Sequence, residues 1–145
     1  MNIDRAIQIA AAAHAGVKDK GGTPYILHPI KVMMRVETEE EQIVAILHDV
    51  VEDTSWTFDA LRDEGFSEKI IEALKTVTKH SEEENYDDFI QRSLTNDIGR
   101  KVKIADLREN LDLTRIGELS VTDIKRLNKY REALHTLEST VVSTR

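Results

Sequence analysis

The chain has 145 residues, the length of a single domain with one hydrophobic core, and its 40% hydrophobic and 32% charged residues are typical of a globular protein. A formal net charge of −7 argues against a nucleic-acid partner, and the absence of cysteine confines any metal site to His, Asp and Glu. No apolar run approaches the roughly 18 residues of a membrane span, and the N-terminal residues lack a signal-peptide pattern, so we expect a cytoplasmic protein.

The N-terminal part of the chain predicts two helices joined by a polar loop. Residues 3–15 are apolar and rich in alanine, and Gly16 is placed to end the first helix. The segment VKDKGGTP at 17–24 has the glycine, proline and lysine content of a loop. We expect the second helix to begin at HPIKVMMRV, with Pro29 in its first helical position.

The middle of the chain carries a helix-start signal. Thr38 and Glu41 have the spacing of a capping box, and apolar residues follow over 43–51. The valine and isoleucine content of 43–51 would also suit a strand, but the capping box and the neighbouring helix signals favour a helix.

Helix signals continue toward the C-terminus, and no repeat or linker divides the chain. The predicted elements are a short helix capped by Thr57 and ended by Gly65, a helix capped by Ser67, helices over 86–95 and 97–111, and a last amphipathic helix with apolar residues from Ile124 to Leu137. Residues 1–145 are therefore expected to form one all-α bundle of six to eight helices. The apolar stripe of the last helix either completes the core or makes a homodimer contact.

A group of ionisable residues lies within and directly after the apolar stretch in the middle of the chain. His48 and Glu52 are four apart, as are Asp49 and Asp53, so on a continuous helix these side chains share one polar stripe. No Lys or Arg occurs over residues 36–61, so the carboxylates have no local cationic partner. Burying uncompensated charge is costly, and a divalent metal ion held by His and carboxylates would supply the missing positive charge.

His28 and Asp106 are two further candidates for such a site. His28 precedes Pro29, which fixes its backbone, and Asp106 lies among apolar residues in VKIADLRENL. All three sites also have an ordinary interpretation. A His–Asp pair such as His48 and Asp49 is commonly at the surface, a His before Pro commonly caps a helix, and a helical Asp commonly pairs with a cation. Spacing alone does not join these sites. The remaining histidines, expected to be structural or solvent-exposed, are His14, His80 and His135.

Three segments together carry a more specific signal than any one of them. HAGVKDKGGTPYILHP, AILHDVVEDT and VKIADLRENL resemble, in order and spacing, the HD-domain metal-dependent phosphohydrolases, and most closely the RelA/SpoT-type guanosine polyphosphate hydrolase domains. The resemblance runs from about residue 4 to residue 116. It implies an HD-type helical bundle that hydrolyses a small phosphorylated nucleotide, which in the alarmone hydrolases is guanosine 3′,5′-bis(diphosphate), with release of pyrophosphate.

The resemblance also implies roles for individual residues. It implies one divalent metal ion, with manganese expected and Fe, Zn, Mg or Co as alternatives, held by His28, His48, Asp49 and Asp106. The acidic pair that positions or activates the attacking water matches Glu52 and Asp53. Asn110 matches an asparagine implicated in nucleotide binding, and Lys20 matches a family lysine. Lys18 lies beside it on the same loop, where both lysines are expected to meet phosphate oxygens.

Three positions where the family commonly has residues for recognising the guanine base depart from the family pattern. Asp19 stands where an arginine commonly packs on guanine, and Leu107 and Glu109 replace the arginine and histidine that often follow the last metal ligand. The alternatives left open are an HD hydrolase of another nucleotide or phosphate ester, a non-catalytic nucleotide-sensing module, and a di-iron oxygenase, which would need further ligands. The resemblance also implies a stand-alone hydrolase, because 145 residues leave no room for synthetase and regulatory domains.

Overall fold

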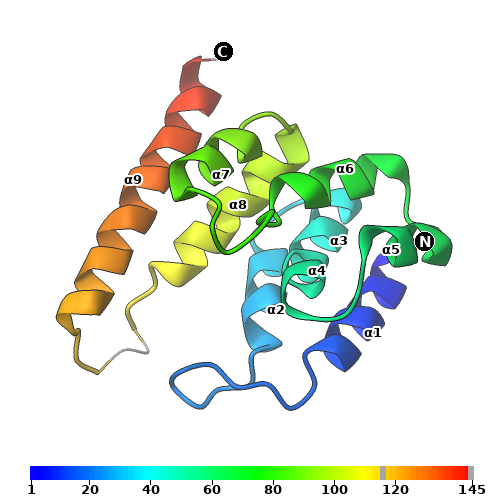
Figure 1. Ribbon diagram of the computed structural model, residues 1–145, viewed down its shortest axis with the longest axis horizontal. Coiled ribbons are helices and arrows are strands. Elements are labelled where there is room, and N and C mark those ends of the chain that lie inside the picture. The colour runs from blue at the N-terminus through cyan, green and yellow to red at the C-terminus, as the bar shows by residue number, and fades with distance from the viewer. Residues whose placement is uncertain (115–116, 144–145) are drawn as a thin grey trace.

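The computed structural model describes residues 1–114 and 117–143 of the chain. The helices are α1 (Ile3–Ala13), α2 (Leu27–Met34), α3 (Glu39–Leu47), α4 (Val50–Asp53), α5 (Phe58–Glu64), α6 (Glu68–Thr76), α7 (Tyr86–Ser93), α8 (Asp97–Asn110) and α9 (Val121–Ser143), as Figure 1 shows. The predicted domain end at residue 145 and the end of the resemblance at residue 116 lie outside the described residues. Within 1–114 and 117–143, every helix is too short or too polar to pass through a bilayer.

The all-α prediction is confirmed. Apart from α4, which is a single turn, the described residues form eight helices, within the predicted six to eight. In the same part of the chain, extended backbone pairing is limited to an isolated bridge between Lys18 and Pro24, which closes the loop after α1. The alternative of a strand over 43–51 is wrong, because this segment is helical up to Leu47 and again from Val50.

The helix boundaries follow the capping signals. Thr38 and Glu41 make both hydrogen bonds of the capping box at the start of α3. The side chains of Thr57 and Ser67 accept hydrogen bonds at the starts of α5 and α6. Gly65 ends α5 with a φ of 105°, a left-handed conformation that glycine adopts without steric cost. These local signals decide where the helices lie before any tertiary contact is made.

Of the boundaries that differ from the sequence-based expectation, two bear on the site. The helix α2 begins at Leu27, so Pro29 occupies its third position and not its first. Proline is tolerated there because the first-turn amides of a helix have no intrahelical acceptor. The second difference is that α3 ends at Leu47 and α4 begins at Val50, so the continuous helix that a single polar stripe would require is absent at residues 48 and 49.

Two hydrophobic clusters form the interior, and α8 contributes to both. The first cluster unites α1 to α6 with the Val102 and Ala105 side chains of α8. The second lies between α7, α8 and α9 and consists of Ile90, Leu107, Ala133 and Leu137. In Figure 1, α9 lies along one edge of the molecule beside α7 and α8, and α1 lies at the opposite end. The C-terminal part of the apolar stripe of the last helix, at Leu137, therefore belongs to the core, whereas Ile124 at its start is 46% exposed.

The contact between α6 and α8 depends on a glycine. A Cβ atom at Gly99 would overlap the Thr76 hydroxyl and would lie 3.4 Å from the Ala73 carbonyl oxygen. That hydroxyl already donates to the same carbonyl over 2.7 Å, so it has little freedom to move away. Asp106 lies two turns further along the same face of α8, so this close approach helps to set where Asp106 lies.

Candidate metal centre and substrate cavity

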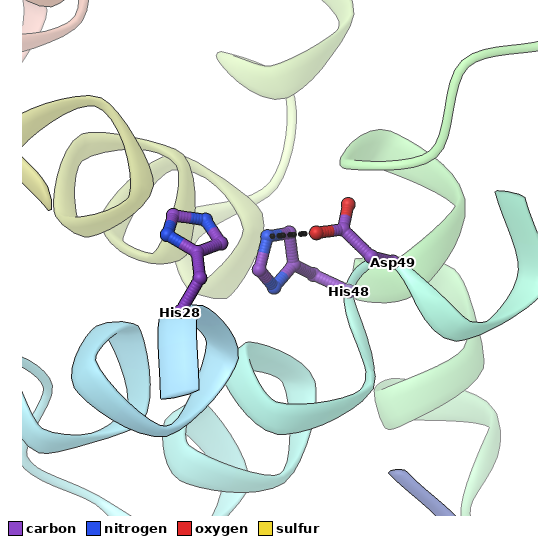
Figure 2. Close-up of side chains that lie close together, drawn as sticks. All are labelled: His28, His48 and Asp49. Carbon is purple, nitrogen blue, oxygen red and sulfur yellow. Dashed lines mark ion pairs between the residues drawn. The ribbon is translucent and has the colours of Figure 1, made fainter. Parts of the chain in front are cut away.

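The four predicted metal ligands converge from three helical segments. His28 lies in the first turn of α2, His48 and Asp49 follow the end of α3, and Asp106 lies in α8. One ligand atom each of His28, His48 and Asp49 lie within 4.8 Å of one another. Figure 2 shows these three side chains close together. Asp106 Oδ1 lies 2.8 Å from His28 Nε2 and 3.4 Å from His48 Nε2. The structure thus brings together residues that spacing alone did not join.

The interruption between α3 and α4 turns both members of the His48–Asp49 doublet toward one point. Consecutive side chains on a continuous α-helix diverge by about 100°. At Asp49 the backbone has φ −104° and ψ −2°, outside regular helix geometry. His48 Nε2 consequently lies 3.1 Å from Asp49 Oδ2, the contact marked by the dashed line in Figure 2. The other ring nitrogen, Nδ1, donates to the Ala45 carbonyl oxygen over 2.6 Å and fixes the ring.

The environment of His48 suits coordination of a cation. Within the described part of the chain, its Nε2 atom is buried and faces the Asp49 and Asp106 carboxylates as ion-pair partners, without a hydrogen bond of ordinary geometry. Burial lowers the pKa of His48, but the charges of Asp49 and Asp106 outweigh burial and raise this pKa well above its usual value. Two imidazole nitrogens and two carboxylates form a donor set that suits Mn, Fe, Zn and related ions. The residues present therefore fit a divalent metal ion.

Asp106 is held from two sides. Lys103 Nζ lies 3.0 Å from its Oδ2, and both side chains are largely buried. Asn110 Nδ2 donates to its Oδ1 over 3.2 Å. Burial alone would raise the pKa of the Asp106 carboxyl, but the Lys103 charge and the hydrogen bond with His28 hold it well below its usual value. Asp106 therefore stays ionised, with one oxygen facing the two histidines.

Asp49 is oriented by a tyrosine that the sequence analysis did not identify. The Tyr25 hydroxyl donates to Asp49 Oδ2. Burial and the Asp49 charge raise the pKa of Tyr25, so its hydroxyl keeps the proton it donates. The ring of His14 packs edge-on against that of Tyr25, with centroids 5.0 Å apart. His14 is buried, as the structural interpretation expected, but it belongs to the surroundings of this site, whereas His80 and His135 are exposed.

The predicted acidic pair faces a neighbouring cavity. Glu52 and Asp53 line a cavity of about 760 Å³ that lies next to α4, and Glu52 Oε1 accepts a hydrogen bond from the Lys79 backbone over 2.9 Å. Burial, together with the Asp49 and Glu52 charges, raises the pKa of Asp53 to about 6. Asp53 can therefore exchange a proton near neutral pH, which is the property expected of a general acid or base.

A cavity of about 390 Å³ opens onto the candidate metal centre. Its lining is rich in lysine and tyrosine and consists of Asp19, Tyr25, His28, Asp49, Lys79, Tyr86, Phe89, Lys103, Asp106, Asn110, Lys129 and Tyr130. The predicted substrate residue Asn110 is among them. The predicted residues Lys18 and Lys20 are exposed on the loop after α1, and the residue between them, Asp19, lines the cavity in their place. Lys79 lines both cavities.

Several lining residues were missed by the sequence analysis. Lys103 lies three residues before Asp106 on a helix, so the spacing rule for side chains on one face could have identified it. Lys129 and Tyr130 come from α9 and carry no such signal, because only the packing of α9 on α7 and α8 brings them to the cavity.

Two relatives are similar in sequence to about half of the chain. A guanosine-3′,5′-bis(diphosphate) 3′-pyrophosphohydrolase from Aquifex aeolicus is 37% identical over 81 residues, which cover 53% of this chain and 12% of that protein. A GTP pyrophosphokinase from Streptomyces coelicolor is 37% identical over 81 residues, which cover 53% of this chain and 9% of that protein. The chain therefore spans only a small part of the length of these relatives.

The fold also has a counterpart among solved structures. A metazoan ortholog of SpoT, described as hydrolysing ppGpp, superposes with a TM-score of 0.77 at 23% sequence identity, covering 95% of this chain and 86% of that chain. This similarity shows a shared helical fold. The family model described as HD domain matches residues 6–140, which include most of α9 as well as the candidate metal centre. HD domains bind divalent metal ions, in agreement with the donor set found here. Because this match extends over nearly its whole length, the chain belongs to the HD-domain family.

Proposed function

We propose that this chain is a metal-dependent phosphohydrolase whose substrate is guanosine 3′,5′-bis(diphosphate). Water would add across the bond between the 3′ oxygen and phosphorus, giving guanosine diphosphate and pyrophosphate. The proposal depends above all on the buried His48 Nε2 atom, which lies 3.1 Å from an Asp49 oxygen and 3.4 Å from an Asp106 oxygen. The choice of substrate is supported by the printed names of relatives such as the Aquifex aeolicus pyrophosphohydrolase.

The proposed metal ligands are His28, His48, Asp49 and Asp106. Manganese is the expected ion, with Fe, Zn, Mg or Co as alternatives, because this donor set accepts all of them. When bound, a divalent ion would act as a Lewis acid toward the phosphoryl group and would lower the pKa of the attacking water.

The chain's own residues would orient the site and move the proton. Lys103 and Asn110 hold the Asp106 carboxylate, and Tyr25 holds that of Asp49. Asp53, with a pKa of about 6, would accept a proton from the attacking water at a carboxylate oxygen and return it. Glu52 would position the Lys79 backbone beside the cavity. Lys18, Lys20 and Asn110 are proposed as substrate contacts.

The remaining proposals concern the setting in which the enzyme acts. We propose that residues 1–145 form one domain, because α8 belongs to both hydrophobic clusters. We propose a small-molecule nucleotide as the partner, action in the cytoplasm, and a homodimer contact as an open alternative to a monomer.

The direct test is an assay of the purified protein with Mn²⁺ and a panel of phosphorylated nucleotides that includes guanosine 3′,5′-bis(diphosphate). Asp49→Ala should lose metal and activity together, whereas Asp59→Ala, whose side chain is 87% exposed, should keep both. Absence of phosphate or pyrophosphate release from every nucleotide, or full activity in Asp49→Ala, would contradict the proposal. Tight nucleotide binding without turnover would indicate a sensing module, and release from a different nucleotide would change the substrate.

A further inference from the structure

The last helix forms one wall of the substrate cavity. Lys129 and Tyr130 of α9 line this cavity together with Tyr86 of α7. One and two turns further along α9, Ala133 and Leu137 are buried in the second hydrophobic cluster, so the helix is fixed in rotation against α7 and α8. Lys129 therefore faces the cavity because of the packing of α9, although α9 lies beyond the segments that carry the sequence resemblance.

Aromatic rings hold the Lys129 ammonium in place. Its Nζ atom lies 4.4 Å from the ring centroid of Tyr86 and 5.9 Å from that of Tyr130. A cation over an aromatic face is attracted by the ring quadrupole, which restricts an otherwise mobile side chain. The Lys129 charge is thereby placed at the cavity before any ligand enters.

The charge of Lys129 is available to a ligand. Of the three lysines that line the cavity, Lys103 is already paired with Asp106 at 3.0 Å. Across the residues that the structure describes, Lys129 makes no ion pair with a carboxylate. An aromatic ring does not neutralise an ammonium group, so Lys129 can still form charge-assisted hydrogen bonds to an anion.

We propose that Lys129, positioned by the ring of Tyr86, binds a phosphate group of the substrate. This inference rests on the proposed function and adds α9 to the substrate-binding part of the chain. The Lys129 ammonium donates to non-bridging phosphate oxygens, while the candidate metal centre lies elsewhere in the same cavity. The ligand class is a nucleotide that carries phosphate groups, and Lys129 contributes to its binding and not to the chemical step.

The test compares steady-state hydrolysis of guanosine 3′,5′-bis(diphosphate), with Mn²⁺, by the wild-type chain and three variants. Lys129→Gln should raise KM roughly 10- to 100-fold, the effect of losing a hydrogen bond to a charged group, and should change kcat by less than about threefold. Lys129→Arg keeps the charge and should restore most of the affinity. The matched control is Arg131→Gln, which makes the same charge change about 200° around α9, at an exposed residue outside the cavity lining.

The outcomes separate this inference from the proposed function. Equal KM values for Lys129→Gln and Arg131→Gln in an active enzyme would overturn the role of Lys129 and leave the proposed function intact. If the wild-type chain hydrolyses no nucleotide, the proposed function fails. Calorimetric titration of the metal-free proteins with inorganic pyrophosphate then tests whether Lys129 binds phosphate. Weaker binding to Lys129→Gln than to Arg131→Gln would support the inference. Equal binding, or no binding to the wild type, would overturn it.

Discussion

Replacing Lys103 by methionine tests whether the candidate metal centre is a balanced set of buried charges. The Lys103 and Asp106 side chains are only 12% and 8% exposed, and their charged atoms lie 3.0 Å apart. Methionine retains the apolar stem of lysine but removes the ammonium group. The variant therefore leaves the Asp106 carboxylate buried without the charge that chiefly keeps it ionised.

The expected loss is large for a single substitution. Removing one partner of a buried ion pair typically costs about 3–5 kcal/mol. For a chain of this length, that loss corresponds to a fall in melting temperature of roughly 6–20 °C. The matched control is Lys101→Met on the same helix, because Lys101 is 46% exposed and pairs with the exposed Asp97, while its contact with the buried Glu41 is longer, at 3.5 Å. Its expected cost is below about 1 kcal/mol.

Urea unfolding of the metal-free proteins, followed by circular dichroism, measures these losses. Mn²⁺ at about 100 times its dissociation constant should add about 2.7 kcal/mol to the unfolding free energy of any variant that still binds it. Bound Mn²⁺ should therefore offset much of the unfolding free energy that Lys103→Met loses. The reasoning is refuted if Lys103→Met and Lys101→Met lose the same unfolding free energy without divalent ions.

Three further substitutions each test one side-chain interaction described above. Tyr25→Phe removes the hydroxyl that orients the carboxylate of the doublet and should weaken Mn²⁺ binding about 10- to 100-fold by calorimetry; unchanged affinity would refute this role. Gly99→Ala should cost about 1–3 kcal/mol of unfolding free energy because the added Cβ overlaps the Thr76 hydroxyl. Adding Thr76→Ala should recover most of this loss. If Gly99→Ala and the double variant lose the same unfolding free energy, the overlap is not the cause. Burial and neighbouring carboxylates raise the pKa of Asp53 to about 6, so Glu52→Gln should lower this pKa in a carboxyl NMR titration, and a constant value would contradict the electrostatic cause. Because this pKa is higher in the folded than in the unfolded state, the stability that Asp53 contributes is present at low pH and lost as pH rises through about 6.

Local signals account for how well the helices were predicted. A capping box such as Thr38 with Glu41 satisfies backbone groups within a few residues, so it can be recognised without knowing the tertiary structure. The break after Leu47 was not predicted, because 43–51 reads as one apolar helix. What separates α3 from α4 includes the His48 side-chain bond to the Ala45 carbonyl, and the residue pattern does not reveal this bond.

The site was predictable only in part. Residue chemistry identified ionisable groups without cationic partners, and the family resemblance joined His28 and Asp106 to the doublet. Lys18 and Lys20 stay a prediction as substrate contacts, and the lysines that line the cavity are Lys79, Lys103 and Lys129. Distances between helices far apart in sequence depend on how complete side chains pack, and no spacing rule along one chain segment contains that information.

One helix connects the two halves of this molecule. Among the described helices, α8 alone has buried side chains in both hydrophobic clusters, and Asp106 lies between Ala105 of the first cluster and Leu107 of the second. Asp106 therefore lies on the helix that both clusters share. We expect loading with an ion to slow amide hydrogen exchange at both ends together, so that the occupancy of a single small site governs the cooperativity of the whole fold.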